Sequence, residues 1–286
     1  MFKKSKTLVK SCMGGVVSCL GAVLSRLGIR RRSLYFPLLF VALGPLFTLR
    51  RALAAEPERP NVVLVYVDDM GYGDATCYNA DAYVETPAID ALAEGGVRFT
   101  NGYVTGPICF PSRVGILTGA HQARFGCYSN LPRVHVPEGQ LVMPQAMEAA
   151  GYATAIVGKW NEVKTKAPEQ YVDKTALILD WGGEYWLPVE RGVDRDKLPV
   201  WGPAEGKGYE TDLMTDAAIE FIDENKDDSF FIYLAYNAPH TPLRALEKFR
   251  DEVAHIETEP ERVYAGILLS IDEGVGRVRA TQQEDG

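Results

Sequence analysis

The sequence has 286 residues, of which 47% are hydrophobic, 24% charged and 10% aromatic. This composition excludes a disordered or fibrous protein and predicts a globular one with a single large domain. Residues 1–55 hold ten Lys and Arg and no Asp or Glu, so the rest of the chain carries 20 basic and 38 acidic residues. A chain this acidic does not bind nucleic acid through a general phosphate field, and any anion needs a local pocket.

The first 55 residues form a segment of their own, ahead of a domain over 56–286. Basic residues, including three arginines at 30–32, precede an apolar stretch over 34–49, which Ala52 and Ala54 follow. This order is typical of a cleaved export signal. An uncleaved membrane anchor is the alternative, although an apolar run of 16 residues is short for a membrane span. We therefore predict an exported protein, periplasmic or secreted, which contacts a membrane only through this segment if it is retained.

Strands and helices alternate along the domain. A β-branched run over 61–67 predicts a buried parallel strand. The other predicted strands cover 97–104, 152–157 and 229–235, and the predicted helices begin at Pro87 with Thr86 as cap, after Pro111, and near Met143, Asp212 and Glu261. This alternation predicts an α/β fold, with a large, mostly parallel sheet covered by helices on both faces. Residues 161–208 have several Pro and Gly without a sustained period, which favours a long loop over a second domain.

Two acidic residues, Asp68 and Asp69, directly follow the first predicted strand. Open α/β sheets bind their ligands beyond the carboxyl ends of the strands, and carboxylate oxygens suit Ca²⁺ or Mg²⁺. Taken alone, such a pair is more often solvated or capping a helix, so the metal hypothesis depends on the surrounding sequence.

Three cysteines, Cys77, Cys109 and Cys127, follow the N-terminal segment. In an oxidising compartment they allow one disulfide with one odd thiol, or no disulfide.

Cys109 opens the run CFPSRVGILTG over 109–119. A lone Cys before a helix is usually buried or disulfide-bonded, and Arg113 would usually be a surface charge. With these residues at these offsets, however, the run resembles the signature of the sulfatase family, in which an enzyme oxidises the Cys to formylglycine.

Other blocks resemble the same family in the same order. They are PNVV at 60–63, DDMGYGD at 68–74, TP at 86–87, VRFTN at 97–101, GKW at 158–160 and APHTP at 238–242. Together they cover roughly residues 60 to 280. The resemblance implies an alkaline phosphatase-like fold and an arylsulfatase-like enzyme that cleaves sulfate monoesters of a small molecule or polysaccharide.

The resemblance also assigns roles to individual residues. Cys109 becomes the formylglycine nucleophile through a formylglycine-generating enzyme, and Arg113 holds its hydrated form. Lys159 clamps the sulfate or the leaving group, and His240 contacts the ester, as a candidate general acid. Asp68, Asp69 and Cys109 are the expected ligands of Ca²⁺, with Mg²⁺ as the alternative. Without the family, Lys159 would read as a solvated lysine and His240 as a loop histidine bonded to backbone.

The chemistry of this site follows from general principles. A hydrated aldehyde at position 109 offers one hydroxyl to attack sulfur, and the other later expels sulfate by re-forming the carbonyl, which splits one difficult step into two. The helix predicted after Pro111 directs its N-terminal amides at the anion. A cation at Asp68 and Asp69 lowers the pKa of the nucleophile and neutralises charge on the sulfate.

Two departures from the family pattern stand out. The family usually has His where this sequence has Asn161, and Asn cannot shuttle a proton near neutral pH. The family's remaining metal ligands lie in a Ser-Asp-x-Gly block, whereas this chain ends at Gly286 soon after the last predicted helix. We therefore expect an incomplete metal site and a catalytic domain truncated at its C-terminus, with a frameshift as one explanation. The alternative function is an inactive sulfatase remnant that at most binds sulfated ligands, and a phosphomonoester or phosphonate ester hydrolase is a weaker third.

Overall fold

The computed structural model describes residues 59–130, 134–161, 163, 168–179, 186–188 and 207–284. The predicted signal or anchor segment over 1–55 lies outside these residues. Met1–Glu58 and Arg59–Gly286 are separate units, and the fold described below belongs to the second. In the part of the chain that is described, no helix is both long and apolar enough to cross a membrane.

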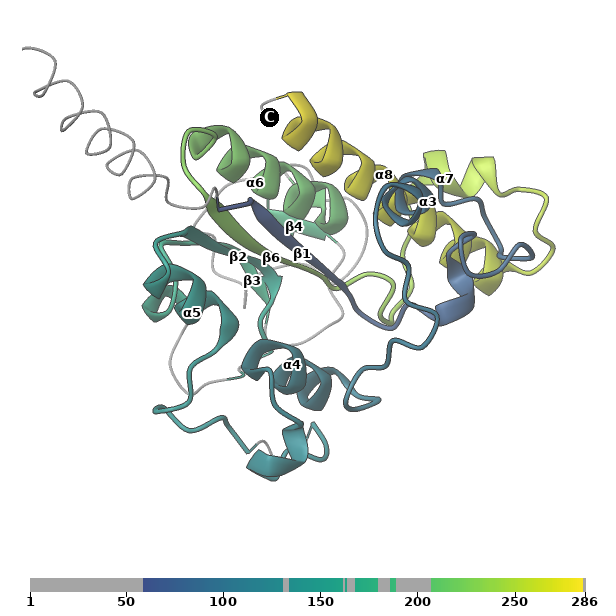
Figure 1. The fold of residues 1–286 in the computed structure, drawn as a ribbon. Helices are drawn as coiled ribbons and strands as arrows, with labels where there is room; N and C mark the ends of the chain where they lie inside the picture. Colours follow the sequence, from purple (N-terminus) through teal and green to yellow (C-terminus); the bar gives the residue numbers. More distant parts are fainter. Residues whose placement is uncertain are drawn as a thin grey trace, which may run out of the picture. The chain divides into compact units, whose positions relative to one another are not determined.

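A four-stranded sheet lies at the centre of the fold (Figure 1). Its strand order is β1 (Val62–Val67), β6 (Phe230–Tyr236), β2 (Ala153–Lys159) and β3 (Lys174–Leu179), and every pairing is parallel. The carboxyl ends of β1, β6 and β2 therefore meet at one edge of the sheet. Three polar residues lie at this edge: Asp68 directly after β1, Lys159 as the last residue of β2, and Asn237 directly after β6.

Helices cover both faces of the sheet, and the side chains of β6 show this directly. Phe230, Ile232 and Leu234 pack in one core cluster with residues of α6 (Glu210–Glu224) and α8 (Glu259–Glu284). Phe231 and Tyr233 pack in the other with residues of α4 (Cys109–Thr118) and α5 (Met143–Ala149). A strand buried on both faces carries a continuous apolar run, which explains the FFIYLAY sequence of β6. The predicted α/β sheet covered on both faces is confirmed.

The smaller elements complete the described fold. They are α3 (Pro87–Gly95), α7 (Glu247–Glu252), and the single-turn helices η1 (Tyr72–Asp74), η2 (Gln122–Phe125) and η3 (Pro168–Gln170). Pro87 opens α3 as predicted, but the predicted capping by the Thr86 side chain is wrong. The Thr86 hydroxyl bonds to Thr76 and Asp90, and the amides of the first turn donate instead to the Asp272 carboxylate of α8, at 2.9 and 3.1 Å. A long-range contact thus replaces the local cap.

Residues 97–104 were predicted to form a strand, and this prediction is wrong. The segment has no regular secondary structure, and Val97, Phe99, Tyr103 and Val104 expose 78, 69, 85 and 62% of their surface. A strand needs a neighbour to accept and donate its backbone hydrogen bonds. None of the described strands pairs with this segment, so its alternating apolar pattern stays without a partner.

The long loop predicted over 161–208 is also partly wrong. β3 lies inside it and joins the main sheet, and β4 (Trp186–Pro188) pairs with β5 (Lys207–Tyr209) as a separate antiparallel ribbon. β3 is hard to recognise because it is irregular, with Leu177 at a φ of 50° and a register shift against β2. Residues 189–206 lie outside the described part of the chain.

Gly158 allows the end of β2 to lie close to its neighbours. Its φ is +91°, a conformation that strongly favours glycine, and a Cβ there would lie 2.3 Å from the carbonyl oxygen of Ala235 and 2.9 Å from the sulfur of Met214. The next residue is Lys159, so this glycine fixes the position from which the Lys159 side chain leaves the sheet.

Replacing Gly158 with Ala is expected to destabilise the protein by more than about 2 kcal/mol, because it adds backbone strain and a clash with a carbonyl that cannot move. Urea unfolding measures the change in the free energy of unfolding. Gly139→Ala is the matched control, since a Cβ at Gly139 meets nothing within 4 Å. A change below about 0.5 kcal/mol for Gly158→Ala, the usual range for surface substitutions, would contradict this account of β2.

Candidate active site

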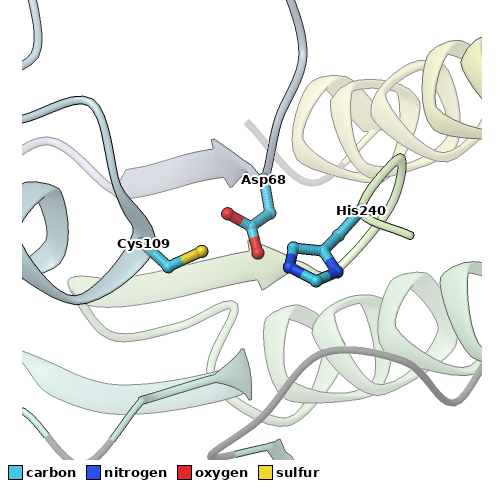
Figure 2. Close-up of side chains that lie close together, drawn as sticks. All are labelled: Asp68, Cys109 and His240. Carbon is cyan, nitrogen blue, oxygen red and sulfur yellow. The ribbon is translucent and has the colours of Figure 1, made fainter. Parts of the chain in front are cut away.

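The predicted site residues converge at the carboxyl edge of the sheet, where α4 begins (Figure 2). One ligand atom each from Asp68, Cys109 and His240 lies within 4.8 Å of the other two. These residues are far apart in the sequence and come from the end of β1, the first residue of α4 and the loop after β6. α4 begins at Cys109 and not after Pro111, so the predicted helix start is corrected to Cys109.

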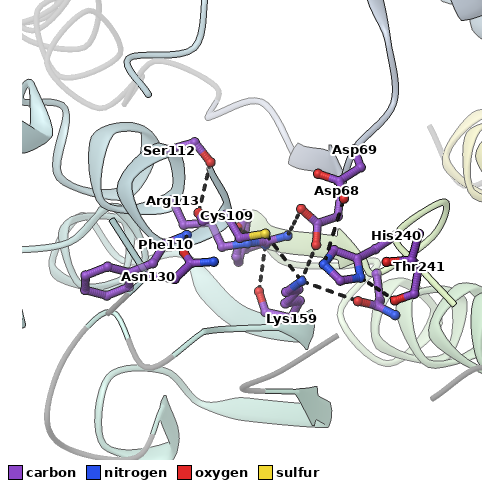
Figure 3. A network of polar contacts seen from close by, with 12 residues as sticks. Asp68, Asp69, Cys109, Phe110, Ser112, Arg113, Asn130, Lys159, His240 and Thr241 are labelled. Carbon is purple, nitrogen blue, oxygen red and sulfur yellow. Dashed lines mark hydrogen bonds and ion pairs between the residues drawn. The ribbon is translucent and has the colours of Figure 1, made fainter. Parts of the chain in front are cut away.

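A buried group of charges surrounds Asp68 (Figure 3). Lys159 Nζ donates a hydrogen bond to Asp68 Oδ2, and Arg113 Nη2 lies 3.7 Å from Asp68 Oδ1. Asp68, Lys159 and Arg113 are only 4, 1 and 0% exposed. Charges this deeply buried are stable only when paired, so the three side chains depend on one another for their positions.

Arg113 is fixed from several sides. Its Nη1 donates to the backbone carbonyl of Lys159 and to the hydroxyl of Tyr233, both at 2.8 Å, and its guanidinium lies 5.1 Å from the centre of the Tyr66 ring. Burial raises the pKa of Tyr233 to about 12, so its hydroxyl is neutral and can accept this bond. The surface-charge interpretation of Arg113 is therefore wrong, and the guanidinium lies in the core beneath the site.

Cys109 is partly buried, and its Sγ lies 3.8 Å from Lys159 Nζ. Ser112 Oγ donates to the Cys109 carbonyl at 2.9 Å, and the next amide, of Phe110, donates to Asn130 Oδ1 at 3.1 Å. Burial raises the pKa of the Cys109 thiol, and Asp68 raises it further while Lys159 opposes them. A cysteine that acts directly as a nucleophile normally has a lowered pKa. The unmodified thiol of Cys109 is therefore protonated at neutral pH and not activated for attack.

His240 and Asp69 lie together at the outer side of this group. His240 Nε2 is 3.8 Å from Asp69 Oδ2, and its Nδ1 is 2.6 Å from the Thr241 carbonyl oxygen, which requires a proton on Nδ1. The Asp69 side chain is 53% exposed, and its backbone has a φ of 67°. The two adjacent acids thus differ, since Asp68 faces the buried cations and Asp69 faces solvent and the histidine.

Two buried residues at the site were missed by the sequence analysis. Asn237 Oδ1 accepts a hydrogen bond from Lys159 Nζ at 3.4 Å, and Asn237 Nδ2 donates to Glu210 Oε2 at 3.5 Å. Asn237 and Glu210 are each 1% exposed. Asn237 could have been suspected because it directly follows a buried strand, at the same edge as Asp68, whereas Glu210 carries no such signal. Asn161, which follows the GKW block, is buried with a φ of 62°.

The described residues fit a Ca²⁺ site only in part. Among them, Asp68 and Asp69 supply carboxylate oxygens, while Cys109 and His240 offer sulfur and nitrogen. Ca²⁺ takes six to eight oxygen ligands, and Asp68 is already paired with two cationic side chains. The expectation of an incomplete metal site stays a prediction. Cys77, Cys109 and Cys127 are all free thiols, so the alternative without a disulfide applies to them.

Comparisons with known proteins bear on the family of the chain. The Sulfatase family model matches residues 60–286. The uncharacterized sulfatase YdeN of Escherichia coli K12 is 30% identical over 80% of this chain and 50% of its own length, and an arylsulfatase of Hemicentrotus pulcherrimus is 34% identical over 67% and 39%. The crystal structure of Ps i-CgsB in complex with k-i-k-neocarrahexaose superimposes with a TM-score of 0.68 at 28% identity, over 80% of this chain and 56% of that one.

The chain thus spans about half the length of the curated relatives that it matches. The family match covers most of the chain, including the whole described fold and every residue of the site. The similarity to the structure of Ps i-CgsB confirms the predicted fold class. The chain therefore belongs to the sulfatase family.

Proposed function

We propose that the protein hydrolyses sulfate monoesters through a formylglycine made from Cys109. The observation that carries this proposal is the position of Cys109. It is the first residue of α4, its Sγ lies 3.8 Å from Lys159 Nζ, and it shares a small cluster with Asp68 and His240. The raised pKa of its thiol supports a precursor role over direct attack by a thiolate.

Formylglycine supplies a hydrated aldehyde whose two hydroxyls serve as nucleophile and as the group that later expels sulfate. The residues of this chain hold the reacting ester. The positive dipole end of α4 favours a sulfate anion next to residue 109, while the Phe110 amide is bonded to Asn130 Oδ1 and the Ser112 amide to the Ile108 carbonyl. Lys159 Nζ offers a charged donor to a sulfate oxygen. His240 lies on the outer side of the cluster, where it can donate a proton to the departing oxygen.

Arg113 acts from beneath the site. Its guanidinium is fully buried and contacts Asp68 and the Lys159 backbone. We therefore assign it to orienting these two residues, with the hydrated form of residue 109 as a further contact once the modification is present.

The substrate class is a sulfated small molecule or polysaccharide. The named activity of the arylsulfatase relative and the saccharide bound to Ps i-CgsB support this class. The proposal also requires a formylglycine-generating enzyme as a partner. The basic and apolar order of residues 1–55 supports export to the periplasm or the medium, with membrane anchoring as the alternative.

We further propose that Asp68, Asp69 and residue 109 contribute to a site for Ca²⁺ or Mg²⁺. The ion would supply positive charge that stabilises the sulfate and the nucleophile. Because the described residues provide few oxygen ligands, a form that binds sulfated ligands without turnover is the competing function.

Replacement of Cys109 with Ala is expected to lower sulfate release from an aryl sulfate at least about 10³-fold, because loss of a covalent nucleophile typically costs that much or more. The protein is produced together with a formylglycine-generating enzyme, and mass spectrometry of the peptide that contains position 109 verifies the conversion. Cys77→Ala is the control and retains activity. Verified conversion without any turnover would contradict the proposed activity and favour the binding function.

Calcium binding to this chain is expected to be weak, with a Kd on the order of 10⁻³ M or higher, because few carboxylates contribute and Lys159 competes for Asp68. Isothermal titration calorimetry with Ca²⁺ measures it without reference to activity. Asp68→Asn removes the residual binding if Asp68 is a ligand. Micromolar affinity, or binding unchanged in Asp68→Asn, would contradict this account of the metal site.

A further inference from the structure

Four charged side chains at the site are almost completely buried. Asp68, Arg113, Lys159 and Glu210 expose 4, 0, 1 and 1% of their surface, and their formal charges cancel. Asp68 is in direct contact with both cations. Glu210, in contrast, is connected to Lys159 through the side chain of Asn237. The second acid of the group is thus held one residue away from the lysine whose charge it balances.

The amide of Asn237 is suited to this intermediate position. Its oxygen accepts from the Lys159 ammonium, and its nitrogen donates to the Glu210 carboxylate. An amide offers an acceptor and a donor on one neutral group, so it can join a cation to an anion and keep them apart. An Asp at this position would put two carboxylates side by side, and an apolar residue would leave both charges without this contact.

We propose that Asn237 is a positioning residue that separates Lys159 from Glu210 and so keeps Lys159 Nζ beside residue 109. In a low-dielectric interior, opposite charges attract strongly when nothing lies between them. Without the amide, the ammonium moves toward Glu210 and away from residue 109. The catalytic consequence rests on the proposed function, because it requires Lys159 to bind the sulfate. The position of Lys159 Nζ does not depend on that function.

A role for Asn237 in separating two charges differs from a space-filling role in how the effects of two substitutions combine. If Asn237 only fills space, a second change at Glu210 adds to the damage. If Asn237 separates two charges, removal of the Glu210 charge by Glu210→Gln removes the pull on Lys159 and repairs part of the loss. A double-mutant cycle measures this difference, since residues in one hydrogen-bond network give non-additive effects.

Tyr236 provides a matched control on the preceding residue of the chain. Its hydroxyl forms a buried hydrogen bond of 2.7 Å with Thr215, within the core cluster on the α6 and α8 side of the sheet. Tyr236→Phe therefore removes a buried polar contact next to Asn237 without touching the site. It shows what the loss of such a contact costs by itself.

The experiment measures kcat and KM for an aryl sulfate in the formylglycine-containing wild type, Asn237→Ala, Glu210→Gln, the double variant and Tyr236→Phe. We expect Asn237→Ala to lower kcat/KM roughly 10²-fold, the scale for a misplaced catalytic contact. We expect the double variant to recover at least about tenfold of this loss, within the usual range of coupling between neighbouring residues. Tyr236→Phe stays near wild type. A double variant no better than Asn237→Ala would overturn the proposal.

Crystal structures of the variants test the same claim without turnover. In Asn237→Ala, Lys159 Nζ is expected to point at Glu210, and in the double variant it returns to residue 109. Asn237→Ser replaces Asn237→Ala if the latter does not fold, because the shorter hydroxyl side chain cannot bridge the two charges. An ammonium that stays beside residue 109 in the single variant would overturn the positioning role. If the wild type shows no turnover, the proposed function fails for this chain, while the crystal structures still decide the position of Lys159.

Discussion

The carboxylate of Asp68 pairs with two buried cations, Lys159 and Arg113, which come from the end of β2 and from α4. Each of these charges would be costly to bury alone, and together they are stable. The group therefore fixes the ends of two strands of the sheet and α4 relative to one another. Cys109 is the first residue of α4, one turn before Arg113, so the position of the candidate nucleophile depends on the same ion pairs.

The parallel sheet makes this arrangement possible. Its central strand β6 is buried on both faces, and the neighbouring strands β1 and β2 end at the same edge. Gly158 lets β2 end close to β6, and Arg113 fills the core beneath the edge. The edge thus combines a few polar side chains with a packed apolar core beneath them. This core restricts the motion of the groups that would hold a sulfate ester.

The sequence predicted the parts that depend on local patterns. Apolar runs located β1, β2 and β6, and the ordered motifs brought Cys109 and His240 to one site. It failed where structure depends on distant partners. The 97–104 segment has the alternation of a strand but no described strand beside it, and the first turn of α3 is capped from α8 by Asp272. The link from Lys159 through Asn237 to Glu210 joins three separate segments of the chain, and no local pattern indicates that Glu210 belongs to it.

A double-mutant cycle between Asp68 and Lys159 measures whether their buried ion pair holds the site together. Urea unfolding gives the free energy of unfolding for the wild type, Asp68→Asn, Lys159→Met and the double variant. We expect a coupling energy of about 2 kcal/mol or more, the range for residues in one buried network. Effects that add to within about 0.5 kcal/mol, as for independent sites, would contradict it.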